Sequence, residues 1–315
     1  MTRFMVRRVM QMLVVMFAVS VLTFLIFNVI PGGDPALRLA GRQPDPGQLE
    51  RIREDWGFDE PLYVQYLKTM GNVVSGDLVS YTTGQDVMDE IWKRAPRTFA
   101  LAIGAAVMWM VFSVGIGLFT AVRAGRFSDR FLTMLALIGI SMPVFWVGAL
   151  MNYYLGFKWG LFPNGGYVPF AEDPWEWFYH LLMPWTALSL LFIGVYSRIL
   201  RSNVLDTMGE DYVRTARAKG LSERRVLLRH VLRNSMVPVI TLWGLDFGAV
   251  IGGGAILTET VFDLQGVGQY AAESIGQLDV PPVLAVTLFA AFFIVLLNAI
   301  VDILYAYLDP RIRLQ

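Results

Sequence analysis

Cysteine is absent from this chain, which excludes a disulfide scaffold, a thiolate metal site and a cysteine nucleophile. Histidine is scarce, because only His180 and His230 occur and fifty residues separate them. No histidine cluster for a metal is therefore expected, and no metal site is predicted. Net charge is also absent: 26 basic residues balance 26 acidic ones. This balance gives no reason to expect binding to nucleic acid.

Charged residues make up only 17% of the chain and hydrophobic residues 55%, whereas a soluble domain carries about 25% charged residues. Six stretches are long and apolar enough to span about 30 Å of hydrocarbon. They are Val9–Ile30, Thr98–Val122, Phe131–Phe157, His180–Ser197, Asn234–Thr258 and Val280–Val301. Irregular backbone facing lipid is too costly, so the sequence predicts an all-α integral membrane protein with six transmembrane helices.

Lysine and arginine are concentrated on alternate connections between these stretches. Seventeen of the 26 basic residues lie near the N-terminus, at 123–130, at 198–233 and near the C-terminus. The last connection, Glu259–Asp279, carries four acids and no base. Since basic residues accumulate in cytoplasmic loops, both termini and these basic connections are expected in the cytoplasm.

The long connection after the first stretch is expected outside. It is predicted to contain helices near Gln48–Trp56 and Leu62–Val74, and it is too small for an independent core. It is either a structural cap on the helix ends or a docking surface for an external protein. The predicted division is residues 1–30 for the cytoplasmic N-terminus and first helix, 31–97 for an external helical segment, and 98–315 for the transmembrane core.

The inner loop 198–237 has the pattern of two helices joined by a glycine turn. Leu205, Met208, Tyr212 and Ala216 repeat at three and four residues, which predicts one helix. Gly220 ends the pattern and Ser222 is placed to cap a second helix. Such a basic, amphipathic pair either rests on anionic lipid headgroups or inserts into a cytoplasmic partner. The sharp corner at Gly220 favours the partner.

Three features inside the predicted spans have alternative interpretations. Asp246 lies nine residues into the fifth stretch, about 13 Å deep at 1.5 Å per residue. A carboxylate at this depth is expected to face the bundle interior or a wet cavity, as a structural group or in the substrate path. Gly252-Gly-Gly254 permits close helix packing, with a hinge as the alternative. Pro143 and Pro184 are expected to kink the third and fourth helices.

The inner loop resembles the cytoplasmic coupling loop of ATP-binding-cassette importer permeases. The matching run is Asp211-Tyr-Val-Arg-Thr-Ala-Arg-Ala-Lys-Gly-Leu221, followed by His230, Arg233, Asn234 and Pro238. The dipeptide, oligopeptide and nickel branch is the most similar. Further segments that look like this branch are Pro31-Gly-Gly-Asp-Pro35, Gly76-Asp77-Leu78, Thr258-Glu-Thr-Val-Phe262, Gly266-Val-Gly268 and Leu308-Asp-Pro-Arg-Ile312. The chain departs from the pattern at the additional Gly33, and at Arg214 and Thr215, where the superfamily has Glu and Ala.

This resemblance implies a type I importer permease that forms half of a translocation path for peptides or similar solutes. It implies a bacterial or archaeal cytoplasmic (inner) membrane. Its expected partners are a second homologous permease, two ATPases that bind ATP and Mg, an extracytoplasmic substrate-binding protein and membrane lipids. No cofactor and no catalytic residue are expected in this chain, which lacks a Gly-x-x-x-x-Gly-Lys-Ser/Thr loop. The residues expected to contact the ATPases are Tyr212, Ala216, Arg217, Lys219, Gly220 and Leu221.

Two other functions were weighed against this one. An ion-gradient-driven secondary transporter is disfavoured because the chain has one deep carboxylate and no evident inverted repeat. An intramembrane enzyme is disfavoured because a metal cluster and a Gly-x-Ser-x-Gly turn are both absent. The cargo itself is left open between a dipeptide, a longer peptide, a nickel chelate and another small solute.

Overall fold

The computed structural model describes residues 2–28, 36 and 46–308. Within these residues the chain consists of helices and turns, with one isolated bridge between Val79 and Asp86. The all-α prediction is therefore confirmed for the described part. The predicted Pro31–Pro35 turn and the Asp309–Ile312 part of the C-terminal motif lie outside the described residues.

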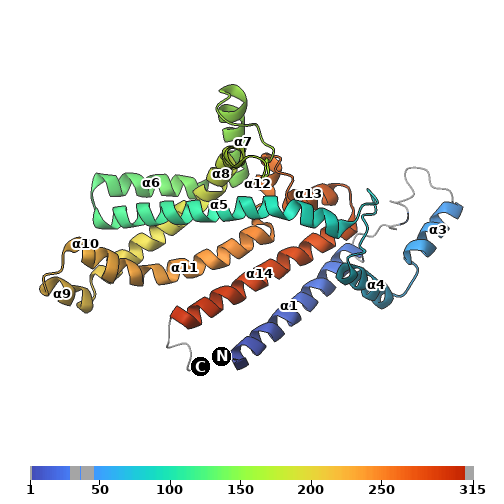
Figure 1. The fold of residues 1–315 in the computed structure, drawn as a ribbon, viewed down its shortest axis with the longest axis horizontal. Coiled ribbons are helices and arrows are strands. Elements are labelled where there is room, and N and C mark those ends of the chain that lie inside the picture. The colour runs from blue at the N-terminus through green and yellow to red at the C-terminus, as the bar shows by residue number, and fades with distance from the viewer. Residues whose placement is uncertain (1, 29–35, 37–45, 309–315) are drawn as a thin grey trace.

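Five helical segments are long and apolar enough to cross a membrane. They lie in α1 (Thr2–Asn28), α5 (Val87–Val122), α8 (Pro174–Met208), α11 (Leu232–Ala249) with its flanking turns, and α14 (Val280–Leu308). Figure 1 shows α5, α8 and α11 running together, with α14 beside α11 and α1 on the far side of α14. A bent pair of helices supplies a sixth span when it is counted as one.

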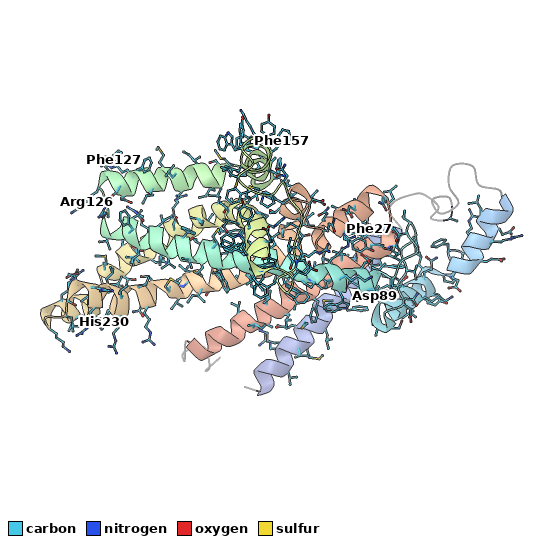
Figure 2. The ribbon with its side chains drawn as sticks, turned by 45° about the horizontal axis from the view of Figure 1, so that its top comes forward. Phe27, Asp89, Arg126, Phe127, Phe157 and His230 are labelled. Carbon is cyan, nitrogen blue, oxygen red and sulfur yellow. The ribbon has the colours of Figure 1, made fainter. Side chains whose placement is uncertain are left out.

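The third predicted span, Phe131–Phe157, is wrong as a single helix. The chain forms α6 (Phe127–Ser141), then α7 (Val144–Met151) with π-helical η1 (Asn152–Lys158), and the two parts meet at 99°. Pro143 causes the break, because the residue before a proline is driven to extended geometry and Met142 has φ −93° and ψ 130°. Figure 1 shows this part of the chain turning away from the long helices, and Figure 2 marks it by Phe157 of η1.

The second predicted span begins within a longer helix. α5 starts at Val87, where the Asp86 side chain accepts a hydrogen bond from the Asp89 amide at 2.8 Å. An aspartate at this position satisfies an otherwise unpaired amide at the helix start. The predicted division between residues 97 and 98 consequently falls inside one helix.

The two helices predicted in the 31–97 segment are confirmed as α3 (Pro46–Trp56) and α4 (Leu62–Ser75). α4 ends at Gly76, whose φ of 88° is left-handed and suits glycine. Helix α4 lies against α1 through Tyr66, whose hydroxyl hydrogen-bonds Ser20 at 2.7 Å and whose ring contacts Phe24 edge-on. Within this segment α4 therefore packs on α1 and α14.

The fifth predicted span, Asn234–Thr258, is interrupted before its end. The helix passes from α11 into η3 (Val250–Gly254), where Gly253 has φ 130°, and α12 (Ile256–Val261) and α13 (Val267–Gly276) follow. Gly252 serves close packing, because a Cβ there would lie 2.4 Å from the Ile294 side chain. The predicted packing role holds at Gly252, while the break in the helix occurs at Gly253.

The molecule has two ends along its long helices. The "loop end" carries residues 123–126 and 209–231, and the "cap end" carries α4, residues 76–86, α12 and α13. Figure 2 marks the loop end by Arg126 and His230 and the cap end by Asp89 and Phe27. Helices α5, α8, α11 and α14 connect the two ends.

Candidate coupling loop and substrate path

The loop end differs from its predicted form in one respect. The expected single helix through Leu205 and Ala216 is wrong, because α8 ends at Met208 and α9 (Asp211–Ala218) begins after Gly209 and Glu210. Because of this break, the residues of α9 face other directions than they would in a continuous helix. As a result Val213 is fully buried, whereas Tyr212 stays 40% exposed.

The underside of this loop packs on the chain itself. After Gly220 the chain continues through α10 (Glu223–Arg225) and π-helical η2 (Val226–Val231) into α11. Val213, Ala216, Val226 and Val231 are buried in the same core as Leu200 and Val204 of α8. The exposed side is mostly charged, with Asp211, Arg214, Lys219, Glu223, Arg224, Arg225 and Arg229. It also includes Tyr212 and Leu228, which are 40% and 46% exposed.

Gly220 forms the corner. Its φ is 78°, a left-handed value that opposes any side chain, and its amide donates to the Arg217 carbonyl at 2.9 Å. A Cβ added here would meet nothing within 4 Å, so the corner points into open space. Arg217 closes the corner with two bonds to the Glu223 carboxylate, at 3.0 and 3.4 Å. Ser222 occupies the N-cap position, but its side chain makes no capping hydrogen bond.

The six predicted contact residues fall into two groups. Tyr212, Lys219 and Gly220 are exposed at the corner or beside it, and Tyr212 accepts a hydrogen bond from Asn234 at 2.7 Å. Arg217 is half-buried, as is Leu221, while Ala216 faces the core at 6% exposure. The structure brings all six into one turn. Ala216 and Leu221 lie on its inner side, where they pack on the core.

A buried ion pair at the loop end was missed by the sequence analysis. Asp129 is 4% exposed and receives two hydrogen bonds from Arg201, each 2.8 Å, and one from the Gly125 amide at 2.9 Å. These bonds join the first turn of α6 to α8, which leads into α9. Its components were visible in the sequence as an acid and a base near span ends, but seventy residues separate them and nothing in the pattern pairs them.

Asp246 faces another helix. The hydroxyl of Tyr196, a fully buried residue of α8, donates to Asp246 Oδ2 at 2.6 Å. One turn before it, Trp243 Nε1 donates to the Ala106 carbonyl of α5 at 3.1 Å. The carboxylate is half-buried and belongs to the region where α5, α8 and α11 meet.

The cap end contains a carboxylate buried more deeply than either of these. Glu259 of α12 has no exposed surface. Its carboxylate accepts from Thr98 Oγ1 at 2.7 Å and from the Gln269 amide at 2.8 Å. Burial raises the pKa of Glu259, and these hydrogen bonds oppose the rise only in part. A Cβ on Gly266 would lie 2.4 Å from this carboxylate, so the glycine makes room for it.

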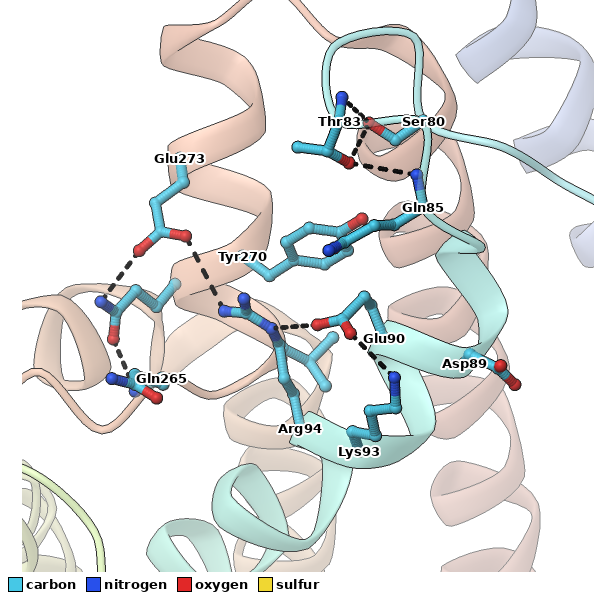
Figure 3. A network of polar contacts seen from close by, with 12 residues as sticks. Ser80, Thr83, Gln85, Asp89, Glu90, Lys93, Arg94, Gln265, Tyr270 and Glu273 are labelled. Carbon is cyan, nitrogen blue, oxygen red and sulfur yellow. Dashed lines mark hydrogen bonds and ion pairs between the residues drawn. The ribbon is translucent and has the colours of Figure 1, made fainter.

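Charged groups at the cap end link segments that are far apart in sequence. Figure 3 shows Arg94 between Glu90, at 3.3 Å, and Glu273 of α13, at 3.7 Å. The Arg94 guanidinium also lies over the Tyr270 ring, 4.7 Å from its centroid. These contacts hold α5 and α13 together.

Asp279 performs a similar role for the 76–86 segment. It is 3% exposed and accepts hydrogen bonds from the Ser80 hydroxyl and from the Tyr81 amide, the latter at 3.0 Å. Burial, together with the charge of Asp279, raises the pKa of Tyr81 to about 12. No group of three or more His, Asp or Glu side chains placed to hold a metal occurs in the described part of the chain.

Comparison with known proteins agrees with this architecture. Residues 113–314 match the family described as binding-protein-dependent transport system inner membrane component, and residues 1–102 match its N-terminal membrane component. A putative peptide transport system permease protein of Brucella abortus is 38% identical over 314 residues, covering 99% of both chains. The glutathione transport system permease protein of Escherichia coli is 37% identical over the same length and with the same coverage.

These matches confirm the predicted type I importer fold and the permease function, and the ion-gradient-driven alternative is disfavoured. Permeases of such systems are not catalytic themselves, and their place is the inner membrane. The chain belongs to the binding-protein-dependent transport permease family of ATP-binding-cassette importers.

Proposed function

We propose that this permease imports peptides or similar small solutes, and that residues 198–237 couple it to a pair of cytoplasmic ATPases which bind ATP and Mg. A second homologous permease completes the translocation path, and an extracytoplasmic protein delivers the substrate. The peptide class rests on the similarity to peptide and glutathione permeases. Both termini and the loop end face the cytoplasm, in keeping with the seventeen basic residues on that side.

The observation that carries the coupling role is the division of the loop into two sides. Most of the apolar side of α9 and η2 is buried in the chain's own core through Val213, Ala216, Val226 and Val231, while Tyr212 and Leu228 stay exposed. A helix pair that rests on lipid needs its apolar side for the membrane. What remains exposed here is a charged surface around an open corner, which suits a polar cleft in a partner protein.

Gly220→Val tests this role. The substitution strains the corner, since left-handed geometry costs about 1–2 kcal/mol for a residue with a side chain, and it adds bulk where a cleft would close on the loop. We expect retention of the ATPases to fall and residual ATP hydrolysis to stop responding to loaded binding protein. The measurement is ATPase retention and substrate-stimulated hydrolysis of the purified complex.

Gly84→Val is the matched control, because Gly84 also has a positive φ, of 67°, and open space around it, but lies at the cap end. It should leave the ATPases bound. If Gly220→Val keeps full retention and normal stimulation, the loop is not the coupling element.

The orientation is tested separately by cysteine labelling, which the absence of native cysteine makes clean. Single cysteines at Gln85 and Ser222 are exposed to a membrane-impermeant thiol reagent in intact cells. We expect labelling at Gln85 and none at Ser222. The reverse pattern would place the loop end outside.

A further inference from the structure

The helices α1 and α14 are in close contact at the cap end and leave an open cavity between them toward the other end. Near the cap end Phe24 of α1 is 2% exposed and packs against Leu284 and Leu288. Toward the N-terminus of α1 several large apolar residues are instead more than half exposed, for example Val9 at 53% and Leu13 at 59%. Figure 1 shows the two helices running side by side.

This cavity has a volume of about 740 Å³, within the range of pockets that hold small molecules. Its lining is apolar except at a few positions. The lining residues from α1 are Arg7, Arg8, Met10, Gln11, Met12, Val14 and Val15, and those from α14 are Ile294, Val295, Asn298 and Ala299. From Arg7 to Val15 the lining extends about 12 Å along α1 at 1.5 Å per residue.

The polar groups of the cavity are placed unequally. Two guanidinium groups, those of Arg7 and Arg8, lie at the end nearest the N-terminus, with Gln11 one turn further on and 3.4 Å from Arg8. Arg7 makes no ion pair with the described residues. On α14, Asn298 Oδ1 is enclosed and receives no hydrogen bond from the described part of the chain. An occupant should therefore combine an anionic end, hydrogen-bonding groups and an apolar tail.

We propose that this cavity binds one anionic phospholipid of the cytoplasmic leaflet. The phosphate lies between Arg7 and Arg8, and an acyl chain occupies the groove between Val14, Val15 and Ile294. Basic pockets between transmembrane helices on the cytoplasmic side attract such headgroups. The inference rests on the cytoplasmic orientation proposed above, and it does not depend on the role of the 198–237 loop.

The charge arrangement favours a lipid over a helix of a second polypeptide. A transmembrane helix that filled the groove would cover two arginines and would have to supply an acidic partner at the same depth, which is costly in a membrane segment. A phospholipid supplies its phosphate at the membrane boundary and its apolar chain immediately below.

The test counts phosphatidylglycerol that stays bound to the purified complex in native mass spectrometry, without nucleotide, after exchange into phosphatidylcholine. Arg7→Gln with Arg8→Gln should weaken retention about 30-fold, since each arginine near an anionic surface contributes a factor of about five. The control changes another adjacent pair, Arg224→Gln with Arg225→Gln, which is exposed and distant from the cavity. If both double variants lose equal amounts of bound phosphatidylglycerol, the lipid is attracted to basic surfaces in general. This result would overturn the proposed site.

A second variant separates the groove from the charges. Val14→Trp fills the cavity and leaves both arginines, so bound phosphatidylglycerol should be lost in the same way. Unchanged retention in Val14→Trp would overturn the proposal, as would a photo-crosslinker at Val14 that labels another polypeptide in native membranes and no lipid. The cysteine labelling at Gln85 and Ser222 reports the orientation independently, so its failure is distinguishable from failure of the lipid site.

Discussion

The two ends of this permease treat their charged side chains in opposite ways. At the cap end, Glu259 is fully buried and Asp279 is 3% exposed, and each is held by groups more than nine residues away in sequence. At the loop end, the outward charges pair with near neighbours, as Arg214 does with Asp211 and Arg217 with Glu223. These loop pairs are largely exposed, and such pairs contribute little to stability.

This difference separates the sources of order at the two ends. The cap end is held by buried polar contacts between α5, α12, α13 and the 76–86 segment, so these parts should behave as one body. The 211–231 loop is held by the packing of its apolar side chains on the core. Its exposed charges are not needed for contacts with distant segments. A surface of this kind can bind a partner without unfolding anything. The Asp129–Arg201 pair is the exception, since it places a buried tertiary contact at the loop end.

The largest effect is expected from Glu259→Ala. It leaves the Thr98 hydroxyl and the Gln269 amide without their partner, and each unpaired buried group costs about 1–3 kcal/mol. We expect a clear loss of thermal stability in the purified complex, measured by melting, while Glu172→Ala, at an exposed position, changes nothing. Unaltered melting of Glu259→Ala would mean that the cap end is not held by this contact.

The pH dependence of the same site sharpens this test. Because burial raises the pKa of Glu259 in the folded protein, the neutral form is favoured by folding, and the contribution to stability is lost as pH rises through that raised value. Glu259→Gln stays neutral, and its amide can donate to Thr98 while its oxygen accepts from Gln269. We therefore expect wild type to lose stability relative to Glu259→Gln as pH rises. A constant difference between the two would contradict the raised pKa.

A smaller loss of stability is expected from the Asp129–Arg201 ion pair at the loop end. Asp129→Asn removes the charge partner of Arg201, and removal of one member of a fully buried pair costs about 3–5 kcal/mol. The Arg201 side chain is 29% exposed, so water compensates in part and the loss should be about 1–2 kcal/mol. Arg201→Lys keeps the charge but loses the two-pronged geometry, so it should fall between wild type and Asp129→Asn in a melting experiment. If Asp129→Asn melts like wild type, the loop end has no buried polar anchor and the contrast between the ends is complete.

The sequence predicted those parts of the molecule that depend on local pattern. Apolar run length predicted where the membrane helices lie, though not the breaks in the third and fifth. Spacing predicted α3, α4 and the glycine turn at Gly220, whose φ of 78° confirms it. The pattern did not reveal the break at Gly209, because Tyr212 and Ala216 continue the helical spacing across it. It also missed the right-angled bend after Ser141, since a proline predicts a kink but not its size.

The tertiary contacts of carboxylates could not be predicted. Glu259 is one of four acids in the last outer connection, and its partner Thr98 lies at the start of the second predicted span. Asp129 and Arg201 are likewise ordinary charges near span ends until the fold brings α6 against α8. One sequence specifies which residues are polar, but the pairing of polar residues between helices follows from packing.

The smallest effect on stability is expected between the two ends, at Asp246. Asp246→Asn keeps an oxygen that can accept from Tyr196, so melting should change by less than about 1 kcal/mol. Transport should nevertheless change if the charge serves the substrate path, because an intramembrane carboxylate is costly to maintain without a use. Tyr196→Phe is the matched variant, since it removes the same 2.6 Å hydrogen bond and leaves the charge. Uptake of labelled peptides by reconstituted complexes separates the two roles. Reduced uptake in Asp246→Asn with normal uptake in Tyr196→Phe assigns the effect to the charge, whereas normal uptake of every tested peptide by Asp246→Asn makes Asp246 a structural residue that ties α11 to α8.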